Sequence, residues 1–287
     1  MVLTKGRWPI VFFMVSLALF LAAAGIFVYY RLGNPLGGKV VNVLLLGVDL
    51  NYTPEGANTG EMTRTDALVV AGLNPQQRKV ALLWIPRDTR AEIPGVGVAK
   101  INAAHARGGP ELAMKTVSEL LGIPVKYYVK TDFTGFQEVI DILGGVEVDV
   151  EQDMSWFDQA ANFRISLTKG RQVLDGDKAL QYIRFRGDRL GDIGRIRRQQ
   201  KLINAVVAKA AQLSSSPRWP ELWRAMRANV ATNLSPRQVV AMADFMYRIR
   251  SRQMEMITLP GDFSEFYWLP DQNKINNITA AWFVDSH

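Results

Sequence analysis

The sequence has no cysteine, and its 287 residues include only two histidines, at positions 105 and 287. The missing thiols exclude disulfides, thiolate metal ligands and thiol catalysis. Two histidines are too few for a His-rich zinc site or for an obvious histidine-based catalytic pair. Any metal is therefore expected to be a hard cation held by carboxylates, with Mg²⁺ as the first choice and Mn²⁺ as its alternative.

Two nucleotide and hydrolase signatures are also missing. The sequence contains no Gly-x-x-x-x-Gly-Lys-Ser/Thr loop and no Gly-x-Ser-x-Gly turn, which disfavours a P-loop NTPase and an α/β-hydrolase. Negative charge is in the minority, since the formal net charge is +7. A basic chain favours an anionic partner, which leaves three candidates: nucleic acid, a membrane surface or a phosphorylated substrate.

An apolar stretch near the N-terminus predicts a membrane anchor. Residues 8–30 carry no charge and lie between Arg7 and Arg31. As a helix they would extend roughly 35 Å, which exceeds the hydrocarbon core of about 30 Å. A signal peptide cleaved near residues 22–25 is the competing interpretation, but signal-peptide cores are only about 7–15 residues long. We therefore expect an uncleaved, single-pass helix.

The charges around this stretch set its expected topology. Lys5, Arg7 and the terminal amine precede the stretch, and Arg31 and Lys39 follow it, which slightly favours a cytoplasmic N-terminus. The protein would then be a cell-membrane protein with a short cytoplasmic tail (1–7), a transmembrane anchor (8–30), a Gly/Pro-rich linker (31–39) and one extracytoplasmic domain (40–287).

Apolar runs and helical periodicity predict an α/β fold. Strands are expected at residues 40–47, 67–73, 79–85, 125–130, 146–150 and, as the last strand, 254–259. Asn-Pro-Gln-Gln between the second and third of these indicates a hairpin. Helices fit residues 111–121, 133–143, 193–213, 218–231 and 235–250. Interleaved strands and helices predict a central mixed β-sheet covered by helices on both faces, an α-β-α sandwich preceded by one transmembrane helix.

Charged residues flank the first three expected strands. Arg64 and Asp66 precede the second strand, Arg87 and Asp88 follow the third, and Asp49 follows the first. If the second and third strands are antiparallel, and the first runs parallel to the third, all five residues meet at one edge of the sheet. That edge is where such sheets usually bind ligands.

Two of these residues are the best candidates for metal ligands. Asp49 and Asp66, together with substrate oxygens and water, would supply what a Mg²⁺ site needs. The plainer alternatives are that Asp66 is a turn residue, that Asp49 is a loop carboxylate, and that Arg87 pairs with Asp88 or another surface carboxylate.

Residues 182–201 concentrate positive charge. From residue 184 to residue 201 there are seven basic side chains and two acidic ones. The arginines alternate as on a strand, and a Gly/Asp turn and the start of a helix follow. Arginine forks bind phosphate bidentately, and a helix N-terminus adds N–H donors and a positive dipole end. A solvated basic helix is the alternative.

Four further polar residues are considered for roles in the site or the fold. Asp192 precedes the helix expected at 193–213, where it either caps that helix or orients and deprotonates an attacking hydroxyl. Arg195 and Gln199 are four residues apart and share a helix face. His105 is expected in a loop, in a structural role.

Taken together, these segments resemble the LytR-CpsA-Psr (LCP) glycopolymer transferases. The order and spacing of the matching motifs hold from about residue 41 to residue 205. The motifs are Asn42-Val-Leu-Leu-Leu-Gly-Val-Asp49, Arg64-Thr-Asp66, Trp84-Ile-Pro-Arg-Asp-Thr89, Lys100-Ile-Asn102, Asp141-Ile-Leu-Gly-Gly-Val146, Tyr182-Ile-Arg-Phe-Arg186 and Gly194-Arg-Ile-Arg-Arg-Gln-Gln200.

The resemblance implies a role for each candidate residue. It implies metal binding by Asp49 and Asp66, and a place in the active site for Arg64 and Asp192. It implies pyrophosphate contacts by Arg87, Arg184, Arg186, Arg195 and Gln199. It also implies an apolar tunnel for a polyprenyl chain, a single N-terminal anchor and a catalytic domain outside the cytoplasm.

The function implied by the resemblance is a Mg²⁺-dependent phosphotransferase. It would move a glycopolymer from a polyprenyl-pyrophosphate carrier to peptidoglycan at the membrane, with no nucleic-acid partner. Three alternatives remain open: a pyrophosphatase acting on the same lipid-linked substrate, a non-catalytic polyprenyl-lipid binder, and a nucleic-acid-binding transcriptional regulator. An extracytoplasmic domain argues against the last, because it does not reach the chromosome.

Overall fold

The structure is a computed structural model that describes residues 38–48, 63–158, 163–187, 191–212, 219–249 and 253–285. Several predicted features lie outside these ranges: the tail 1–7, the anchor 8–30, residues 31–37 of the linker, and Asp49. Within the described ranges, no helix is long and apolar enough to cross a membrane.

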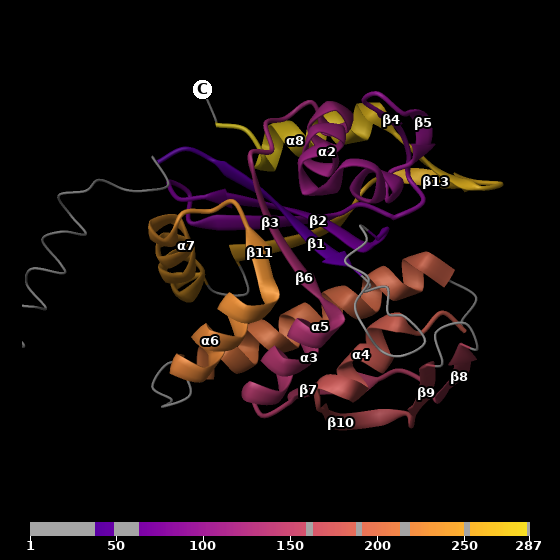
Figure 1. The fold of residues 1–287 in the computed structure, drawn as a ribbon, viewed down its shortest axis with the longest axis vertical. Coiled ribbons are helices and arrows are strands. Elements are labelled where there is room, and N and C mark those ends of the chain that lie inside the picture. Colours follow the sequence, from indigo (N-terminus) through magenta and orange to yellow (C-terminus); the bar gives the residue numbers. More distant parts are fainter. Residues whose placement is uncertain are drawn as a thin grey trace, which may run out of the picture.

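A six-stranded mixed sheet forms the centre of the molecule (Figure 1). Its order is β11-β6-β1-β2-β3-β12, with strands at Val230–Thr232, Tyr127–Asp132, Val41–Val48, Thr65–Asn74, Lys79–Trp84 and Met254–Thr258. β2 is antiparallel to both β1 and β3, whereas β6 runs parallel to β1 and β12 parallel to β3. The predicted mixed sheet and its hairpin are confirmed.

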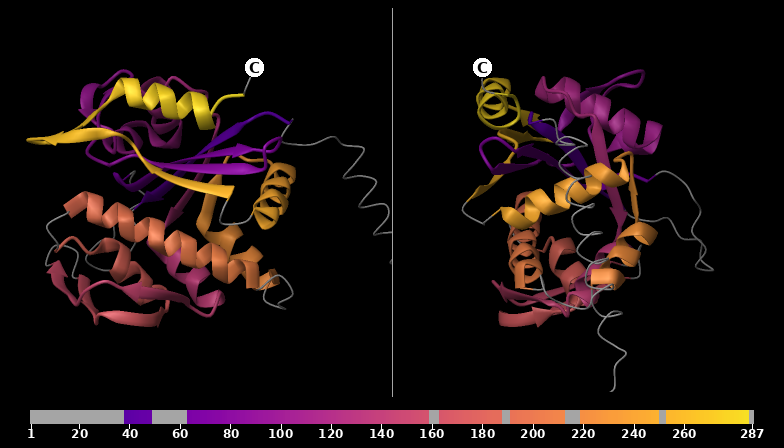
Figure 2. Two further views of the ribbon diagram at one scale, coloured as in Figure 1. Left: turned by 180° about the vertical axis from the view of Figure 1, so that it is seen from behind. Right: turned by 90° about the vertical axis from the view of Figure 1, so that its left-hand side faces the viewer.

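Helices cover both faces of this sheet (Figure 2). Alternate residues of a strand face opposite sides, so Leu44 packs with α2 (Ala103–Leu121) and α8 (Gln272–Trp282), while Val43 packs with α5 (Gly191–Gln212) and α7 (Pro236–Arg248). Both strand residues are fully buried. The predicted α-β-α arrangement is therefore correct for the described part of the chain.

A smaller lobe packs beneath α5, at the bottom of Figure 1. It contains α3 (Phe133–Ile142), α4 (Gly176–Arg184) and the strands β7 (Val146–Val150), β8 (Met154–Asp158), β9 (Phe163–Leu167) and β10 (Gly170–Leu174). α6 (Trp219–Asn229) packs against α3. The strand predicted at 146–150 exists, but it pairs with β10 in a two-stranded sheet and not with the central sheet.

Two further hairpins join each other beside the central sheet. β4 (Arg90–Ile93) pairs with β5 (Gly97–Lys100), and β13 (Gly261–Ser264) pairs with β14 (Tyr267–Pro270). A bridge between Thr89 and Trp268 links the two hairpins. The prediction that residues 254–259 form the last strand is therefore wrong, because two strands and α8 follow β12.

Three local predictions also differ from the structure. Residues 182–184 form the last turn of α4 and not a strand; Phe185 ends this helix with an extended backbone (φ −60°, ψ 134°). The predicted helix 218–231 stops at Asn229, because Val230–Thr232 pairs with β6. His105 lies in a helix and not in a loop, because α2 begins at Ala103 and continues through a kink at Gly108 and Gly109.

Candidate active site

Strand directions bring the charged segments to one edge of the sheet. β1 and β3 run the same way and β2 runs between them in the opposite direction, so Val48 at the end of β1 pairs with Thr65 at the start of β2. After β3, the Ile85 N–H donates to the carbonyl of Leu68 at 2.9 Å. Asp66 and Arg87 therefore meet as predicted. Asp49, the residue after Val48, lies outside the described ranges.

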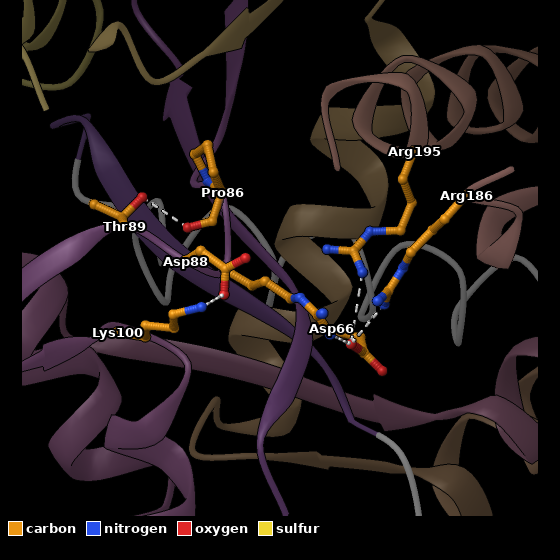
Figure 3. Close-up of polar contacts among 8 residues, drawn as sticks. Asp66, Pro86, Asp88, Thr89, Lys100, Arg186 and Arg195 are labelled. Carbon is orange, nitrogen blue, oxygen red and sulfur yellow. Dashed lines mark hydrogen bonds and ion pairs between the residues drawn. The ribbon is translucent and has the colours of Figure 1, made fainter. Parts of the chain in front are cut away.

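Three guanidinium groups converge on the carboxylate of Asp66 (Figure 3). Its Oδ1 lies 2.8 Å from Nη1 of Arg87, 3.4 Å from Nη2 of Arg186 and 3.6 Å from Nη1 of Arg195. These side chains come from the turn after β3, the segment after α4 and the first turns of α5. The structure thus joins four of the residues predicted for the site, from parts of the sequence up to 129 positions apart.

The cluster is basic and partly withdrawn from water. Three guanidinium charges and one carboxylate leave two positive charges in excess. Arg195 is only 3% exposed, whereas Arg186 is 42% exposed and Asp66 25%. Coulombic attraction is stronger where water is excluded, so an anion that reaches this cluster would be held more tightly than at an exposed pair. The arrangement suits binding of a phosphate or diphosphate.

A tight turn aims Arg87 at Asp66. The carbonyl of Pro86 accepts hydrogen bonds from the Thr89 N–H at 3.0 Å and from Thr89 Oγ1 at 2.7 Å. Asp88 lies in the same turn and pairs with Nζ of Lys100 at 3.0 Å (Figure 3). Arg87 therefore pairs with Asp66 at the sheet edge, whereas its neighbour Asp88 pairs with Lys100.

Arg184 is held differently from the other arginines. Its guanidinium carbon lies 4.9 Å from the ring centre of Phe133 and 4.4 Å from that of Phe163. Both distances are within the range of cation–π attraction. The two rings come from the start of α3 and the start of β9. The structure thus shows Arg184 stacked on two aromatic rings in the smaller lobe.

Three other predicted residues, Arg64, Gln199 and Asp192, are not among the ion-pair partners described for Asp66. Arg64 is exposed and immediately precedes β2, and Gln199 is half-buried on α5, one turn after Arg195. Within the described residues, neither contacts the Asp66 carboxylate. Asp192 lies inside the first turn of α5, because this helix begins at Gly191. It is therefore not the residue that precedes the helix, and the predicted capping position is wrong.

In its described part, the basic segment formed by residues 182–201 is only partly exposed to solvent. Arg195 and Arg198 are each only 3% exposed, whereas Arg197 is exposed and Lys201 is half-buried. A buried guanidinium requires partners, because removing its charge from water costs several kcal/mol (order of magnitude). The alternative of a solvated basic helix fails for the two buried arginines.

The carboxylate of Asp66 is suited to binding a hard cation, but by itself it supplies only one of the ligands that such an ion needs. In Figure 3 its second carboxylate oxygen points away from the arginines. Carboxylate oxygen is the donor that Mg²⁺ prefers, and one or two carboxylates plus substrate phosphates are its usual protein ligands. Among the described residues no group of three or more acidic, His or Cys side chains forms a metal cluster. The donor type of Asp66 fits Mg²⁺, and Asp49, the other predicted ligand, lies outside the described residues.

Several residues around the site carry no functional signal in the sequence. Phe133 and Phe163, which flank Arg184, lie 51 and 21 positions from it in the sequence, so no local pattern signals the pairing. Lys100 lies in the Lys-Ile-Asn motif, but the motif does not reveal its partner. Asp132 ends β6 beside Val48 at the same edge, and it caps α3 by accepting the Gly135 N–H.

Several known proteins are similar to this chain in sequence and in fold. The chain is 35% identical over 248 residues to the polyisoprenyl-teichoic acid–peptidoglycan teichoic acid transferase TagT of Bacillus subtilis (strain 168), covering 84% of this chain and 76% of TagT. The structure of B. subtilis TagV matches with a TM-score of 0.71 and 29% identity, over 85% of this chain and 97% of TagV.

A further solved structure carries a lipid. The LytR-CPS2A-psr family protein YwtF (TagT) with bound octaprenyl pyrophosphate lipid matches with a TM-score of 0.64 and 31% identity, over 84% of this chain and 88% of that protein. Residues 33–283 match the LytR_cpsA_psr family. The chain therefore belongs to the LytR-CpsA-Psr family.

Proposed function

We propose that this protein transfers a glycopolymer from a polyprenyl-pyrophosphate carrier to peptidoglycan. The observation that carries the proposal is the convergence of Arg87, Arg186 and Arg195 on Asp66 at the sheet edge. A basic, partly buried cluster of this kind matches the charge of a diphosphate. The names of the relatives support the substrate class, since TagT is a teichoic acid transferase that uses a polyisoprenyl carrier.

In the proposed reaction, a hydroxyl of peptidoglycan attacks the phosphorus attached to the glycopolymer. A new P–O bond forms to this hydroxyl, the bond to the bridging oxygen of the diphosphate breaks, and the lipid monophosphate leaves. Arg87, Arg186 and Arg195 would hold the diphosphate and stabilise the charge that spreads over its oxygens. The hydroxyl proton needs a base, and Asp192 is the candidate on sequence grounds.

Mg²⁺, bound by Asp66 and Asp49, would neutralise negative charge on the diphosphate. Asp66 also orients the three arginines, because its Oδ1 is their common partner. The same carboxylate would therefore position both the cation and the guanidinium groups.

A reconstituted reaction tests the proposal. Purified full-length protein in detergent is incubated with a polyprenyl-pyrophosphate-linked glycopolymer, with and without peptidoglycan, and the products are resolved by mass spectrometry. Covalent attachment of the polymer to peptidoglycan, abolished by EDTA and restored by Mg²⁺, supports the transferase. Release of lipid phosphate at an equal rate without peptidoglycan would establish a pyrophosphatase in its place.

The proposed location is the outer side of the cell membrane. The absence of cysteine makes topology easy to measure. Single cysteines are introduced as Thr4→Cys before the predicted anchor and as Arg171→Cys on β10, where the side chain is exposed. In intact cells a membrane-impermeant maleimide should label only the Arg171→Cys variant. Labelling of the Thr4→Cys variant alone would reverse the topology and would revive a cytoplasmic role.

A further inference from the structure

Among the described residues, Arg198 is the most deeply buried arginine or lysine that the phosphate-binding proposal does not use. It lies on α5, three residues after Arg195, and is 3% exposed. Its Nη2 donates a hydrogen bond of 2.7 Å to the carbonyl of Phe185, and its Nη1 donates one of 3.1 Å to Oε1 of Glu151. Its guanidinium carbon also lies 5.2 Å from the ring centre of Phe185. These contacts direct the guanidinium toward the α4–α5 connection.

Glu151 is fixed in turn by a buried tyrosine. Its Oε2 accepts a hydrogen bond of 2.9 Å from the hydroxyl of Tyr182, which lies in α4 and is fully buried. Burial and this hydrogen bond raise the pKa of the Tyr182 phenol well above its ordinary value, so the hydroxyl remains a donor. The two oxygens of Glu151 therefore connect α4, through Tyr182, to α5, through Arg198.

The position of Phe185 gives this network a link to the candidate active site. Phe185 is the residue immediately before Arg186, whose guanidinium contacts Asp66. Arg198 therefore holds the backbone of the segment that carries Arg186, from the same helix that carries Arg195. Arg186 and Arg195 approach one carboxylate oxygen from two separate segments, and Arg198 ties these segments together.

We infer that Arg198 is a positioning residue that sets the location of Arg186 relative to Arg195. It acts through the Phe185 carbonyl, and Glu151 and Tyr182 hold its guanidinium in place. This inference rests on the proposed function, since Arg186 is taken to bind the diphosphate. Arg198 itself does not touch the substrate in this proposal, because its Nη atoms are directed at Phe185 and Glu151.

The bidentate geometry explains why arginine is needed. The two acceptors are served by two different nitrogens of one planar guanidinium, and a single ammonium group does not reproduce that fork. Arg198→Lys keeps the charge and most of the aliphatic stem while removing the second nitrogen. The matched control is Arg197→Lys, which makes the same chemical change at the adjacent, exposed position of α5.

A double-mutant cycle with Arg186→Ala separates positioning from general destabilisation. Affinity for octaprenyl pyrophosphate and the transfer rate are measured for wild type, Arg198→Lys, Arg186→Ala and the double variant, with thermal unfolding followed by circular dichroism. We expect Arg198→Lys to lower affinity or rate about tenfold in the wild-type background, because small misplacements of catalytic groups have large effects. In the Arg186→Ala background the same change should have less than a twofold effect, since its target is absent.

Equal losses in both backgrounds would overturn the inference, and so would wild-type affinity and rate in a folded Arg198→Lys variant. If Arg198→Lys does not fold, Tyr182→Phe takes its place in the cycle. It keeps the ring and removes only the hydrogen bond to Glu151, and we expect about a threefold loss that vanishes in the Arg186→Ala background. No loss with Tyr182→Phe would then overturn the inference. If the wild-type protein binds the lipid but transfers no glycopolymer, the proposed function is contradicted. The inference about Arg198 is still tested, because the double-mutant cycle can be evaluated from the lipid affinities.

Discussion

Nη1 of Arg195 lies 3.6 Å from Oδ1 of Asp66, and the arginine of this pair is almost completely buried whereas the aspartate is one-quarter exposed. The buried charge sits on the helix, and the solvent-facing charge sits on the strand of the central sheet. A buried guanidinium that loses its counter-charge is strongly destabilising, by about 3–5 kcal/mol. Asp66 therefore has a structural task as well as its proposed part in metal and substrate binding.

The first prediction contrasts Arg186→Ala with Arg195→Ala. Both remove a proposed diphosphate contact, so both should lower the transfer rate at least tenfold, corresponding to about 1.4 kcal/mol or more of transition-state stabilisation. They should differ in stability. Arg186 is 42% exposed, so its removal should change the free energy of unfolding by no more than about 0.5 kcal/mol.

Arg195→Ala should lower the unfolding free energy by about 1–3 kcal/mol, because it empties a buried position beside Asp66. Arg171→Ala is the control, since Arg171 on β10 is largely exposed and pairs with Glu147 on β7. Transfer rates and thermal midpoints are measured for all three variants. A wild-type rate in Arg186→Ala or Arg195→Ala would remove that residue from the site.

The second prediction concerns Asp66→Asn. The amide is nearly isosteric but uncharged, so the three guanidinium groups lose their common counter-charge and a bound cation loses an anionic ligand. We expect the Mg²⁺ concentration for half-maximal transfer to rise about tenfold or more, together with a drop in the thermal midpoint. Asp244→Asn, on the surface of α7, is the control. An unchanged Mg²⁺ requirement would exclude Asp66 as a ligand.

The central sheet follows from the sequence because its inner strands β1, β2 and β3 are buried on both sides. A continuous apolar run such as residues 43–46 is typical of a strand that helices cover on both faces. The antiparallel pairing of β2 with β3 then places Asp66 beside Arg87. The smaller lobe was less predictable. Its strand β10 alternates exposed and partly buried residues, and its paired residues on β7 lie 20 to 28 positions earlier in the chain.

The arginine run shows where a local pattern misleads. Tyr182-Ile-Arg-Phe-Arg186 alternates like a strand, yet Tyr182 is buried in α4 because its ring fills the core beneath α5. Alternation over five residues also fits the end of one helical turn followed by an extended residue. The family resemblance named the arginines that face Asp66, together with Arg184, which does not. Which arginines are buried depends on partners such as Glu151 that are distant in the chain.

The third prediction concerns the aromatic rings around Arg184. Phe163→Leu retains an apolar side chain but removes the ring that lies closest to the guanidinium. A cation–π contact contributes about 0.5–2 kcal/mol, so affinity for octaprenyl pyrophosphate should fall about two- to thirtyfold if Arg184 binds the diphosphate. Isothermal calorimetry measures the change.

A matched control lies on the same hairpin. The ring of Phe157 lies 5.4 Å from the guanidinium carbon of Arg164, so Phe157→Leu removes an equivalent stacking contact away from Arg184. It should leave lipid affinity unchanged. If both variants lose affinity equally, the effect belongs to the hairpin as a whole and Arg184 has no special dependence on its rings.

The last prediction uses the scarcity of histidine. His105 is 2% exposed, and its Nδ1 lies 2.7 Å from the carbonyl oxygen of Thr63, the residue before Arg64. Burial lowers the pKa of its imidazole, with Lys130 acting in the same direction, while the Thr63 contact and Glu111 partly oppose the shift. The folded protein therefore favours neutral His105 in a range where the unfolded chain is protonated.

The sign of the effect follows from linkage. Stability from neutral His105 is complete above the unfolded pKa of about 6.5 and falls as the pH drops from there to the lowered folded pKa. The loss is about 1.4 kcal/mol for each unit by which the pKa is lowered. His105→Gln should remove this dependence, so its thermal midpoint should fall less than that of the wild type between pH 7 and pH 5.

Nuclear magnetic resonance measures the pKa of His105 directly, because protein labelled with ¹³C-histidine gives signals only from His105 and His287. The signal lost in His105→Gln should titrate below pH 6.5 in the wild type. A signal that titrates at or above that value would mean that the imidazole is charged near neutrality. Nδ1–H would then donate to Thr63 as part of a cation, and protonation would strengthen the attachment of the segment leading to Arg64 and Asp66.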